Sequence, residues 1–368
     1  MVQFLPLPAL WLAFYLLGRV PAGHLRGYAV ASISLLILVC YAGAPTGAAF
    51  AGIGLALILA GLWLKAQPDG RTRRLTFALS VVATVGLIAV FLQFRVYVQK
   101  YFLAIPSLSY LGFRGIAWLT SAYKRRPVDL SSGLLQMFFF PSVLMGPITR
   151  VENFQELRRD YEGVLRRLAF AFPMLIGGKL AGQLVIARPG AGDLLPWWRY
   201  WIGAVANSFE LYFTFAGYSH LVIGLGLLAG YPLPENFNAP YLSTSINEFW
   251  RRWHMSLSFW IRDYVYIPLG GNRKGIVRKC LNLVGAMGIC GIWHGLELHY
   301  LLWGLFHGML LAGESTMTHR SWRPLTRLPR VVYVPLKTVI VFALVTFAWL
   351  LFRYQVSEVA VYLRRLKP

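Results

Sequence analysis

The sequence predicts an all-α, polytopic transmembrane helical bundle, and three features of its 368 residues indicate this fold class. Hydrophobic residues make up 57% of the chain and charged residues only 14%, whereas soluble domains carry about a quarter charged residues. The mean hydropathy is +0.55. The 13 tryptophans and 19 tyrosines suit the two membrane–water interfaces, where amphipathic rings gather. We therefore expect the lipid bilayer to be the solvent of most of the chain.

Ten apolar segments are candidate membrane spans, since a spanning helix needs about 20 mostly apolar residues and tolerates about 17. Residues 48–64 and 75–94 qualify without a charged residue. The other segments are shorter, interrupted or merged, and the total is about ten spans. No long polar tract separates them, so we expect a single membrane domain over residues 1–368. The remaining candidate spans are 5–17, 28–41, 134–146, 168–187, 202–229, 281–293, 300–312 and 331–352.

The basic residues lie between the apolar segments. Lys and Arg total 36 against 14 Asp and Glu, which gives a net charge of +22. Short basic loops beside spans are the positive-inside pattern, whereas a nucleic-acid-binding function would need a recognition motif that this chain does not carry. We therefore expect membrane lipids and no nucleic acid as partners. The basic runs are 65–74, 124–126, 150–167 and 251–279.

The segment 231–272 is too charged to span a membrane and too aromatic for an ordinary loop. Ser245 and Glu248 have the spacing of a capping box, which predicts that a helix begins there. Large apolar residues follow at helical spacing, with polar residues on another side, so the helix is amphipathic and interfacial or re-entrant. Pro268 is expected to end it. The apolar positions are Trp253, Leu257, Trp260 and Tyr264.

Two histidines are candidate catalytic residues. His294 follows an apolar run and lies between Trp293 and Gly295, and His254 lies inside the predicted amphipathic helix. An ionisable residue at membrane depth is costly without a partner or a function, and a neutral imidazole can act as a base near physiological pH. The alternative is that His254 is a structural residue that packs against aromatic rings at the level of the lipid headgroups. We expect no metal site, because the spacing of His294, His299 and His307 does not place them on one helical face.

The stretch NFNAPYLSTSINEFWRRWHMSLSFWIRDYVYIPLGGNR and the later GIWHG resemble the membrane-bound O-acyltransferase (MBOAT) family. The resemblance extends over residues 138–308 and is strongest to the bacterial branch of the alginate O-acetylation and teichoic acid D-alanyl transfer proteins. It implies a bundle around a central tunnel, with His294 as the central catalytic histidine and His254 as the second. It also implies an O-acyltransferase of the bacterial cytoplasmic (inner) membrane, which moves an acyl group from a cytoplasmic thioester to a hydroxyl at or across the bilayer. The acceptor would be a cell-envelope polysaccharide, a lipid or a relay protein.

The implied donor is a phosphopantetheine thioester on coenzyme A or an acyl carrier protein, which is a co-substrate and not a permanently bound cofactor. Its phosphate favours nearby arginines, although these could equally be positive-inside anchors. Developing negative charge on the thioester oxygen needs a donor, for which His254, Asn247 and the Trp293 indole are candidates. The candidate substrate-binding residues are Asn247, Trp250, Arg251, Arg252, Trp253, Arg262, Arg273 and Trp293.

Two other function classes fit a basic membrane protein with intramembrane histidines. A transporter or flippase would use the histidines along a substrate or proton path, and an inverted repeat would favour it, but none is visible. A non-catalytic scaffold would dock a carrier protein on its basic face and leave the chemistry to a partner. The resemblance also makes a separate periplasmic or membrane-tethered acyltransferase a possible partner of an active enzyme. Consumption of the thioester by the purified protein separates the enzyme from both alternatives.

Overall fold

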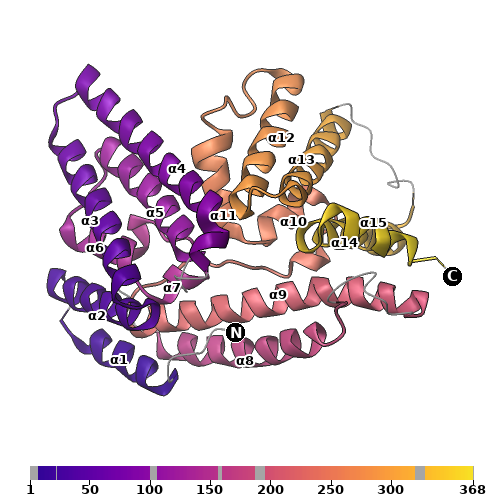
Figure 1. The fold of residues 1–368 in the computed structure, drawn as a ribbon, viewed down its shortest axis with the longest axis horizontal. Helices are drawn as coiled ribbons and strands as arrows, with labels where there is room; N and C mark the ends of the chain where they lie inside the picture. The colour runs from indigo at the N-terminus through magenta and orange to yellow at the C-terminus, as the bar shows by residue number, and fades with distance from the viewer. Residues whose placement is uncertain are drawn as a thin grey trace. The chain divides into compact units, whose positions relative to one another are not determined.

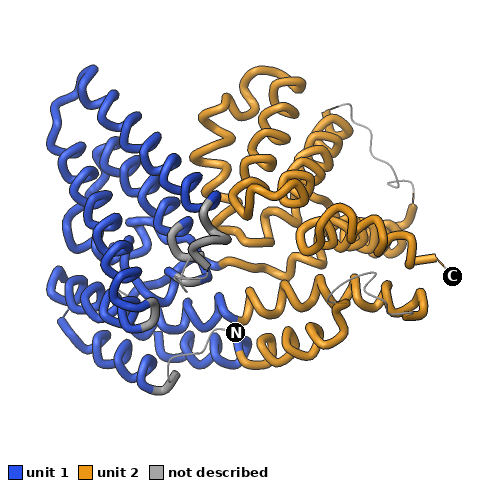
Figure 2. The backbone as a smooth tube through the Cα atoms, in the orientation of Figure 1, with its two compact units in different colours: residues 1–171, 218–235 blue, residues 172–217, 236–368 orange. Residues whose placement is uncertain are grey.

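The computed structural model describes residues 7–21, 23–99, 106–155, 160–186, 195–319 and 328–367. All the regular structure within these residues is helical and includes fifteen α-helices (Figure 1), which confirms the all-α prediction. The chain divides into two compact units (Figure 2). Unit 1 comprises residues 1–171 and 218–235, and unit 2 comprises residues 172–217 and 236–368. The single domain over residues 1–368 stays a prediction.

Unit 1 contains the first seven α-helices and parts of α8 (Tyr161–Gly182) and α9 (Trp197–Leu228). Helix α5 (Pro106–Tyr123) packs beside both α3 (Ala44–Ala66) and α4 (Arg71–Gln99) (Figure 1). A short 3₁₀-helix, η1, follows the seventh helix. The bounds of the other elements are Leu7–Arg19 for α1, His24–Ala42 for α2, Leu130–Phe138 for α6, Pro141–Leu144 for α7 and Val151–Phe154 for η1.

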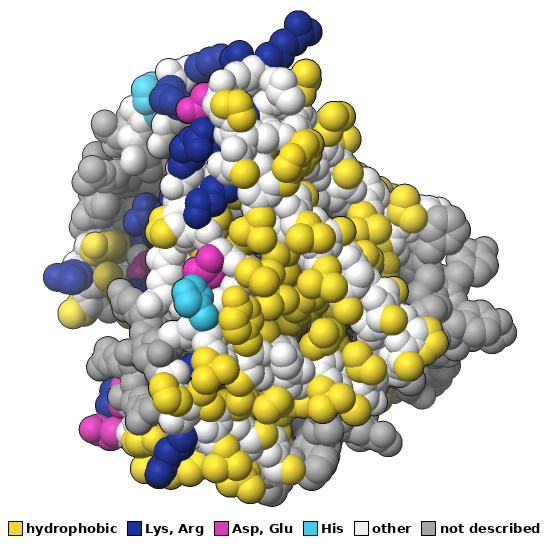
Figure 3. Space-filling model, turned by 90° about the vertical axis from the view of Figure 1, so that its left-hand side faces the viewer, with side chains coloured by type: hydrophobic (Ala, Val, Ile, Leu, Met, Phe, Trp, Pro, Cys, Tyr) yellow, Lys and Arg dark blue, Asp and Glu magenta, His cyan; other side chains and the backbone are white. Residues whose placement is uncertain are grey.

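The outer faces of several helices are apolar and exposed, as expected for contact with lipid. On α4, Leu79 and Val82 are each 67% exposed, and Figure 3 shows a broad apolar area with lysine and arginine side chains at its edge. A soluble monomer does not expose contiguous apolar surface of this extent. Among the described residues, α3, α4, α9, α12 (Gly275–His294) and α14 (Arg330–Arg353) are long and apolar enough to span a bilayer. The chain is therefore a polytopic membrane protein.

Helix α5 is not among the predicted spans, and its apolar sequence contains Arg114. The side chain of Arg114 is fully buried and donates to the carbonyl oxygens of Gln136 and Met137, each at 3.3 Å. It also donates to Ser142 Oγ at 2.8 Å. These carbonyls lie at the end of α6, where a helix leaves acceptors unsatisfied and favours a cation. Arg114 thus joins two helices inside the unit.

The predicted span 134–146 is wrong as a continuous helix. The structure breaks it into α6 and α7, which Phe139 and Phe140 separate. Pro141 lies at the first turn of α7, where a proline needs no partner for its missing N–H but prevents α6 from continuing. The other predicted spans each correspond to one observed helix, although the predicted bounds at positions 5 and 187 lie outside the described residues.

Unit 2 contains the helices that position the candidate site. Helices α12 and α13 (Leu298–His319) pack side by side (Figure 1). A Cβ on Gly291 would overlap the carbonyl oxygen of Tyr300, and one on Gly304 would overlap that of Met287. Small residues therefore bring the two backbones into contact. The other elements of unit 2 are η2 (Pro240–Leu242), α10 (Ile246–Arg252), α11 (Met255–Ile261), η3 (Arg262–Tyr266), α14 and α15 (Val356–Arg364).

Candidate active site

The predicted amphipathic helix begins where expected but is interrupted at His254. Ser245 Oγ accepts from the N–H of Glu248 at 3.0 Å, which confirms the start of α10. The Glu248 carboxylate does not complete a capping box, since it accepts from the N–H and hydroxyl of Thr244 at 2.8 and 2.9 Å. His254 then has a left-handed backbone (φ 40°, ψ 55°), which is uncommon for a non-glycine residue. The single helix of the prediction is therefore two short helices, α10 and α11, followed by the π-helical turn η3.

The segment 236–238 causes this interruption, because its backbone satisfies the helix ends that meet there. The N–H of Met255 donates to the carbonyl oxygen of Asn236 at 2.9 Å, and the N–H of Asn238 donates to that of Arg252 at 3.0 Å. A chain segment from outside the helix thus replaces the hydrogen bonds that a continuous helix would form. A non-glycine residue with left-handed backbone is an outlier of the kind that clusters at functional sites. Here this backbone sets the direction of the His254 imidazole.

Asn236 fixes the tautomer of His254. The N–H and the hydroxyl of Ser256 both donate to Asn236 Oδ1, at 3.4 and 2.8 Å, so the oxygen of the amide faces this pocket. His254 Nδ1 lies 3.1 Å from the same oxygen and must therefore carry the proton that it donates. In a neutral imidazole the other nitrogen is then an acceptor. His254 Nε2 is buried and has no hydrogen-bond partner among the described residues.

The electrostatic environment keeps His254 neutral. Burial lowers the pKa of His254 well below its usual value, and the positive charge of His294 when protonated lowers it further. The two imidazoles are thus close enough to interact, which the sequence separation of 40 residues could not show. Because Nδ1–H already donates to Asn236, the neutral ring can accept a hydrogen bond at Nε2. This geometry favours a base or acceptor role for His254 over donation to an oxyanion.

His294 is the last residue of α12 and lies among aromatic rings. Its imidazole contacts the edges of Phe352 and Trp303 at centroid distances of 4.8 and 5.3 Å, and Tyr300 lies at 6.2 Å. A Cβ on Gly295 would overlap the side chains of Glu297 and Tyr300, so the glycine makes room for the turn that follows. The ring is half-buried, and its aromatic surroundings reduce the competition of water for hydrogen bonds to the imidazole.

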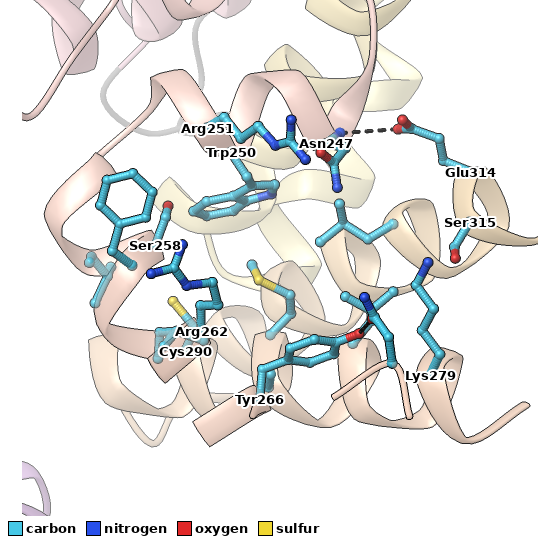
Figure 4. A pocket seen from close by; sticks show the side chains of 18 of the residues that line it. Asn247, Trp250, Arg251, Ser258, Arg262, Tyr266, Lys279, Cys290, Glu314 and Ser315 are labelled. Carbon is cyan, nitrogen blue, oxygen red and sulfur yellow. Dashed lines mark hydrogen bonds between the residues drawn. The ribbon is translucent and has the colours of Figure 1, made fainter. Parts of the chain in front are cut away.

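A cavity of about 730 Å³ lies between α10, α11, η3, α12 and α13. Figure 4 shows Trp250 and Arg251 of α10, Arg262 of η3 and Cys290 of α12 around it. The N–H of Asn247 donates to Glu314 of α13 at 3.0 Å. Arg262 contacts Asp263 at 2.7 Å and lies over the Phe259 ring. The described lining combines an apolar wall with cations, but it does not include His254 or His294.

Four of the eight candidate substrate-binding residues line this cavity, namely Asn247, Trp250, Arg251 and Arg262. The other four lie elsewhere in unit 2. Arg252 forms an ion pair with Glu248 at 2.7 Å, and Arg273 is exposed after η3. Trp253 is buried against Trp349 at 4.7 Å, while Trp293 packs beside His294 at 4.3 Å. The substrate-binding role of all eight stays a prediction.

Sequence reasoning missed several residues that surround the histidines. Asn236 was quoted only as part of a motif, and its distance in sequence from His254 concealed the hydrogen bond. His307 is fully buried, and its Nδ1 accepts from the indole N–H of Trp250 at 3.3 Å. Trp303 contacts both His307, at 5.2 Å, and His294, at 5.3 Å. The spacing of Trp303 and His307 by four residues was the available signal that these rings share one face of α13.

The chain matches one protein-family model and several known proteins in sequence. The model of the membrane-bound O-acyltransferase family matches residues 194–357. The chain is similar to a probable alginate O-acetylase of Pseudomonas aeruginosa, with 37% identity over 281 residues that cover 72% of this chain and 51% of the relative. It is also similar to the peptidoglycan O-acetyltransferase of Helicobacter pylori, with 29% identity over 348 residues, 80% of this chain and 65% of the relative. The teichoic acid D-alanyltransferase of Bacillus subtilis is 30% identical over 277 residues, 67% of each chain. The chain spans about half the length of the alginate relatives.

Proposed function

The chain belongs to the membrane-bound O-acyltransferase family, and from this premise we propose that it transfers an acyl group from a cytoplasmic thioester to a hydroxyl. The acceptor belongs to a cell-envelope polysaccharide, a lipid or a relay protein at or across the membrane. Relatives that are named for alginate, peptidoglycan and teichoic acid support an envelope polymer as the acceptor class. We further propose about ten spans around a central tunnel, and a location in the bacterial inner membrane.

The observation that carries this proposal is the neutral imidazole of His254, with Nε2 buried and unpartnered among the described residues, within reach of the charge of His294. In the proposed reaction, His294 takes the single proton of the acceptor hydroxyl, and the neutral ring of His254 leaves the imidazolium that forms on His294 without a like-charged neighbour. The hydroxyl oxygen then bonds to the acyl carbon and the carbon–sulfur bond breaks. The departing thiolate receives the proton from His294, so the enzyme returns to its starting state.

The cavity lined by Arg251, Arg262 and Lys279 supports a phosphopantetheine donor. Cations at the polar rim suit the phosphate of such a donor, and the apolar wall suits its uncharged arm and the acyl group. Coenzyme A and an acyl carrier protein share this arm, so the cavity accommodates either. A periplasmic or membrane-tethered acyltransferase is a possible partner that would pass the acyl group to the final acceptor.

The test is consumption of an acyl thioester by the purified protein in detergent or nanodiscs, with and without a polysaccharide acceptor. We expect thioester consumption that the acceptor accelerates, and we expect His294→Ala to abolish it while the protein still inserts and folds. An intact thioester in the wild-type reaction would indicate a transporter or a scaffold. Wild-type rates in His294→Ala would mean that another group removes the proton.

A further inference from the structure

Three rings of unit 2 each carry a buried nitrogen with no hydrogen-bond partner among the described residues, namely Trp303 Nε1, His307 Nε2 and His254 Nε2. An unpaired buried donor or acceptor is destabilising, so these atoms need an explanation. The ring of Trp303 contacts His307 at 5.2 Å and the edge of His294 at 5.3 Å. The ring of Trp303 therefore links His307 to the residue to which we assign the proton transfer.

The hydrogen bonds present in the site determine which of these atoms donate. An indole nitrogen is only a donor, so the bond from Trp250 to His307 Nδ1, at 3.3 Å, makes that Nδ1 an acceptor. The single proton of a neutral His307 must then be on Nε2. Trp303 Nε1 is likewise a donor. These rings thus offer two N–H donors without acceptors, and His254 Nε2 is an acceptor without a donor.

Ring packing holds both donors in place. His307 is stacked on Phe249 at 6.0 Å with an interplanar angle of 5°. Trp303 is stacked on Trp349 at 5.9 Å with an angle of 23°. The residues lie one helical turn apart on α13, which Gly304 and Gly308 fix against α12 through close backbone contact. Their N–H groups are therefore fixed in direction before a substrate arrives, which is the requirement for electrostatic stabilisation of a transition state.

We propose that Trp303 Nε1–H and His307 Nε2–H form the oxyanion hole for the acyl carbonyl oxygen. This inference rests on the proposed function. When the acceptor oxygen bonds to the acyl carbon, the carbonyl π electrons move onto the oxygen, and the two N–H groups stabilise that negative charge. The electrons return as the carbon–sulfur bond breaks. Neither donor loses its proton during the step, whereas the hydroxyl proton goes to His294.

The arrangement also accounts for the opposite hydrogen-bonding states of two buried histidines. Asn236 holds the proton of His254 on Nδ1 and leaves an acceptor at Nε2, while Trp250 holds the proton of His307 on Nε2 and leaves a donor for a carbonyl. Acyl transfer needs one group of each kind. Because Trp250 also lines the cavity, it connects the proposed donor site with the state of His307.

The experiment compares His307→Phe, His307→Gln and Trp303→Phe in the thioester assay with the full chain. Phenylalanine keeps the ring packing and removes the N–H, so we expect kcat to fall by about 10²- to 10³-fold for each phenylalanine variant. KM should change by less than about threefold, because the interaction is specific to the transition state. His307→Gln loses the ring but retains an N–H donor, and we expect its kcat to exceed that of His307→Phe.

A purely structural role predicts the reverse order, with His307→Phe at least as active as His307→Gln, and that order would overturn the proposal. Retention of more than a third of wild-type kcat by both phenylalanine variants would also overturn it. His299→Phe is the matched control, since His299 is a buried histidine on the same helix, and we expect its kcat within twofold of wild type. Monodispersity in size-exclusion chromatography checks folding, and if His307→Phe does not fold, Trp303→Phe decides the question by the same criterion. A wild-type protein that consumes no thioester refutes the proposed function itself, which distinguishes the two failures.

Discussion

Replacement of Asn236 by aspartate tests the argument that this residue sets the protonation of His254. The substitution keeps the oxygen that accepts from His254 Nδ1, at 3.1 Å, and from the two donors of Ser256. It adds one negative charge beside a buried imidazole. The local hydrogen bonds are therefore preserved while the electrostatic potential at the ring changes, which separates a titration effect from a loss of structure.

The magnitude follows from the distance. A carboxylate and an imidazolium with charge centres about 4 Å apart interact by about 4 kcal/mol at an effective dielectric constant of about 20. This energy equals a rise of about 3 units in the pKa of His254. Burial raises the pKa of the new carboxyl itself and reduces the effect. His294 interacts with His254, so the two rings titrate together, and we expect the acidic limb of the pair to move up by about 1–2 units.

The assay is the pH dependence of kcat for thioester consumption. In the wild type, burial holds the pKa of His254 well below its usual value. Nε2 therefore remains unprotonated in acidic solution and can still accept a hydrogen bond. Activity is lost as the pH falls through the pKa of the folded state, and a raised pKa moves this loss to higher pH. Asn236→Asp should therefore be active at neutral pH and should lose activity at a pH about 1–2 units higher than the wild type does. Asn236→Leu should lose activity by about 10²-fold at every pH, because positioning is lost.

Asn207→Asp is the matched control. Asn207 is also buried in unit 2, and its Oδ1 accepts from Arg353 at 2.8 Å. A carboxylate there should leave the acidic limb in its wild-type position. The reasoning about the tautomer is refuted if Asn236→Asp has the acidic limb and the kcat of the wild type, or if the limb moves to lower pH.

Two further predictions concern His254 itself and the cations of the cavity. His254→Ala should lower kcat by about 10²- to 10⁴-fold with normal membrane insertion, and a loss below twofold in the thioester assay would exclude His254 from the site. Arg251→Gln and Arg262→Gln should each raise the KM for the thioester donor about five- to tenfold with little change in kcat, because a charge-assisted hydrogen bond to phosphate is lost. Lys274→Gln is the control, since Lys274 is exposed outside the described lining of the cavity, and equal KM values in all three variants would favour the anchoring alternative.

The sequence predicted the helical class and the family, because both depend on local patterns. Apolar runs identified most helices, and the motifs around His254 and His294 identified the family that the comparisons confirm. Prediction from the sequence failed where a single residue interacts with residues that are distant in the sequence. Helix α5 was not predicted, and the acceptors of its buried Arg114, on α6 and at Ser142, lie 22 to 28 residues away.

The same limit applies to the site. Helical periodicity predicted one amphipathic helix across His254, since periodicity cannot register the backbone of residues 236–238 that ends α10. It identified two histidines as candidate catalytic residues but could not assign their tautomers, which depend on Asn236 and on the packing around the rings. His307 was considered only as a metal ligand. Its hydrogen bond with Trp250, 57 positions earlier, gives it a different role.

The backbone contacts at Gly291 and Gly304 restrict how the cavity can change shape. Helices that touch through their main chains cannot slide past or separate from each other without losing the packing along their length. His294 on α12 and the rings of Trp303 and His307 on α13 therefore keep constant spacing through a turnover cycle. Any widening that admits a bulky donor has to come from α10 and α11, which meet at one residue of left-handed backbone. Under the proposed function, entry of the donor therefore depends on this junction, and the geometry of the reacting groups depends on the pair α12 and α13.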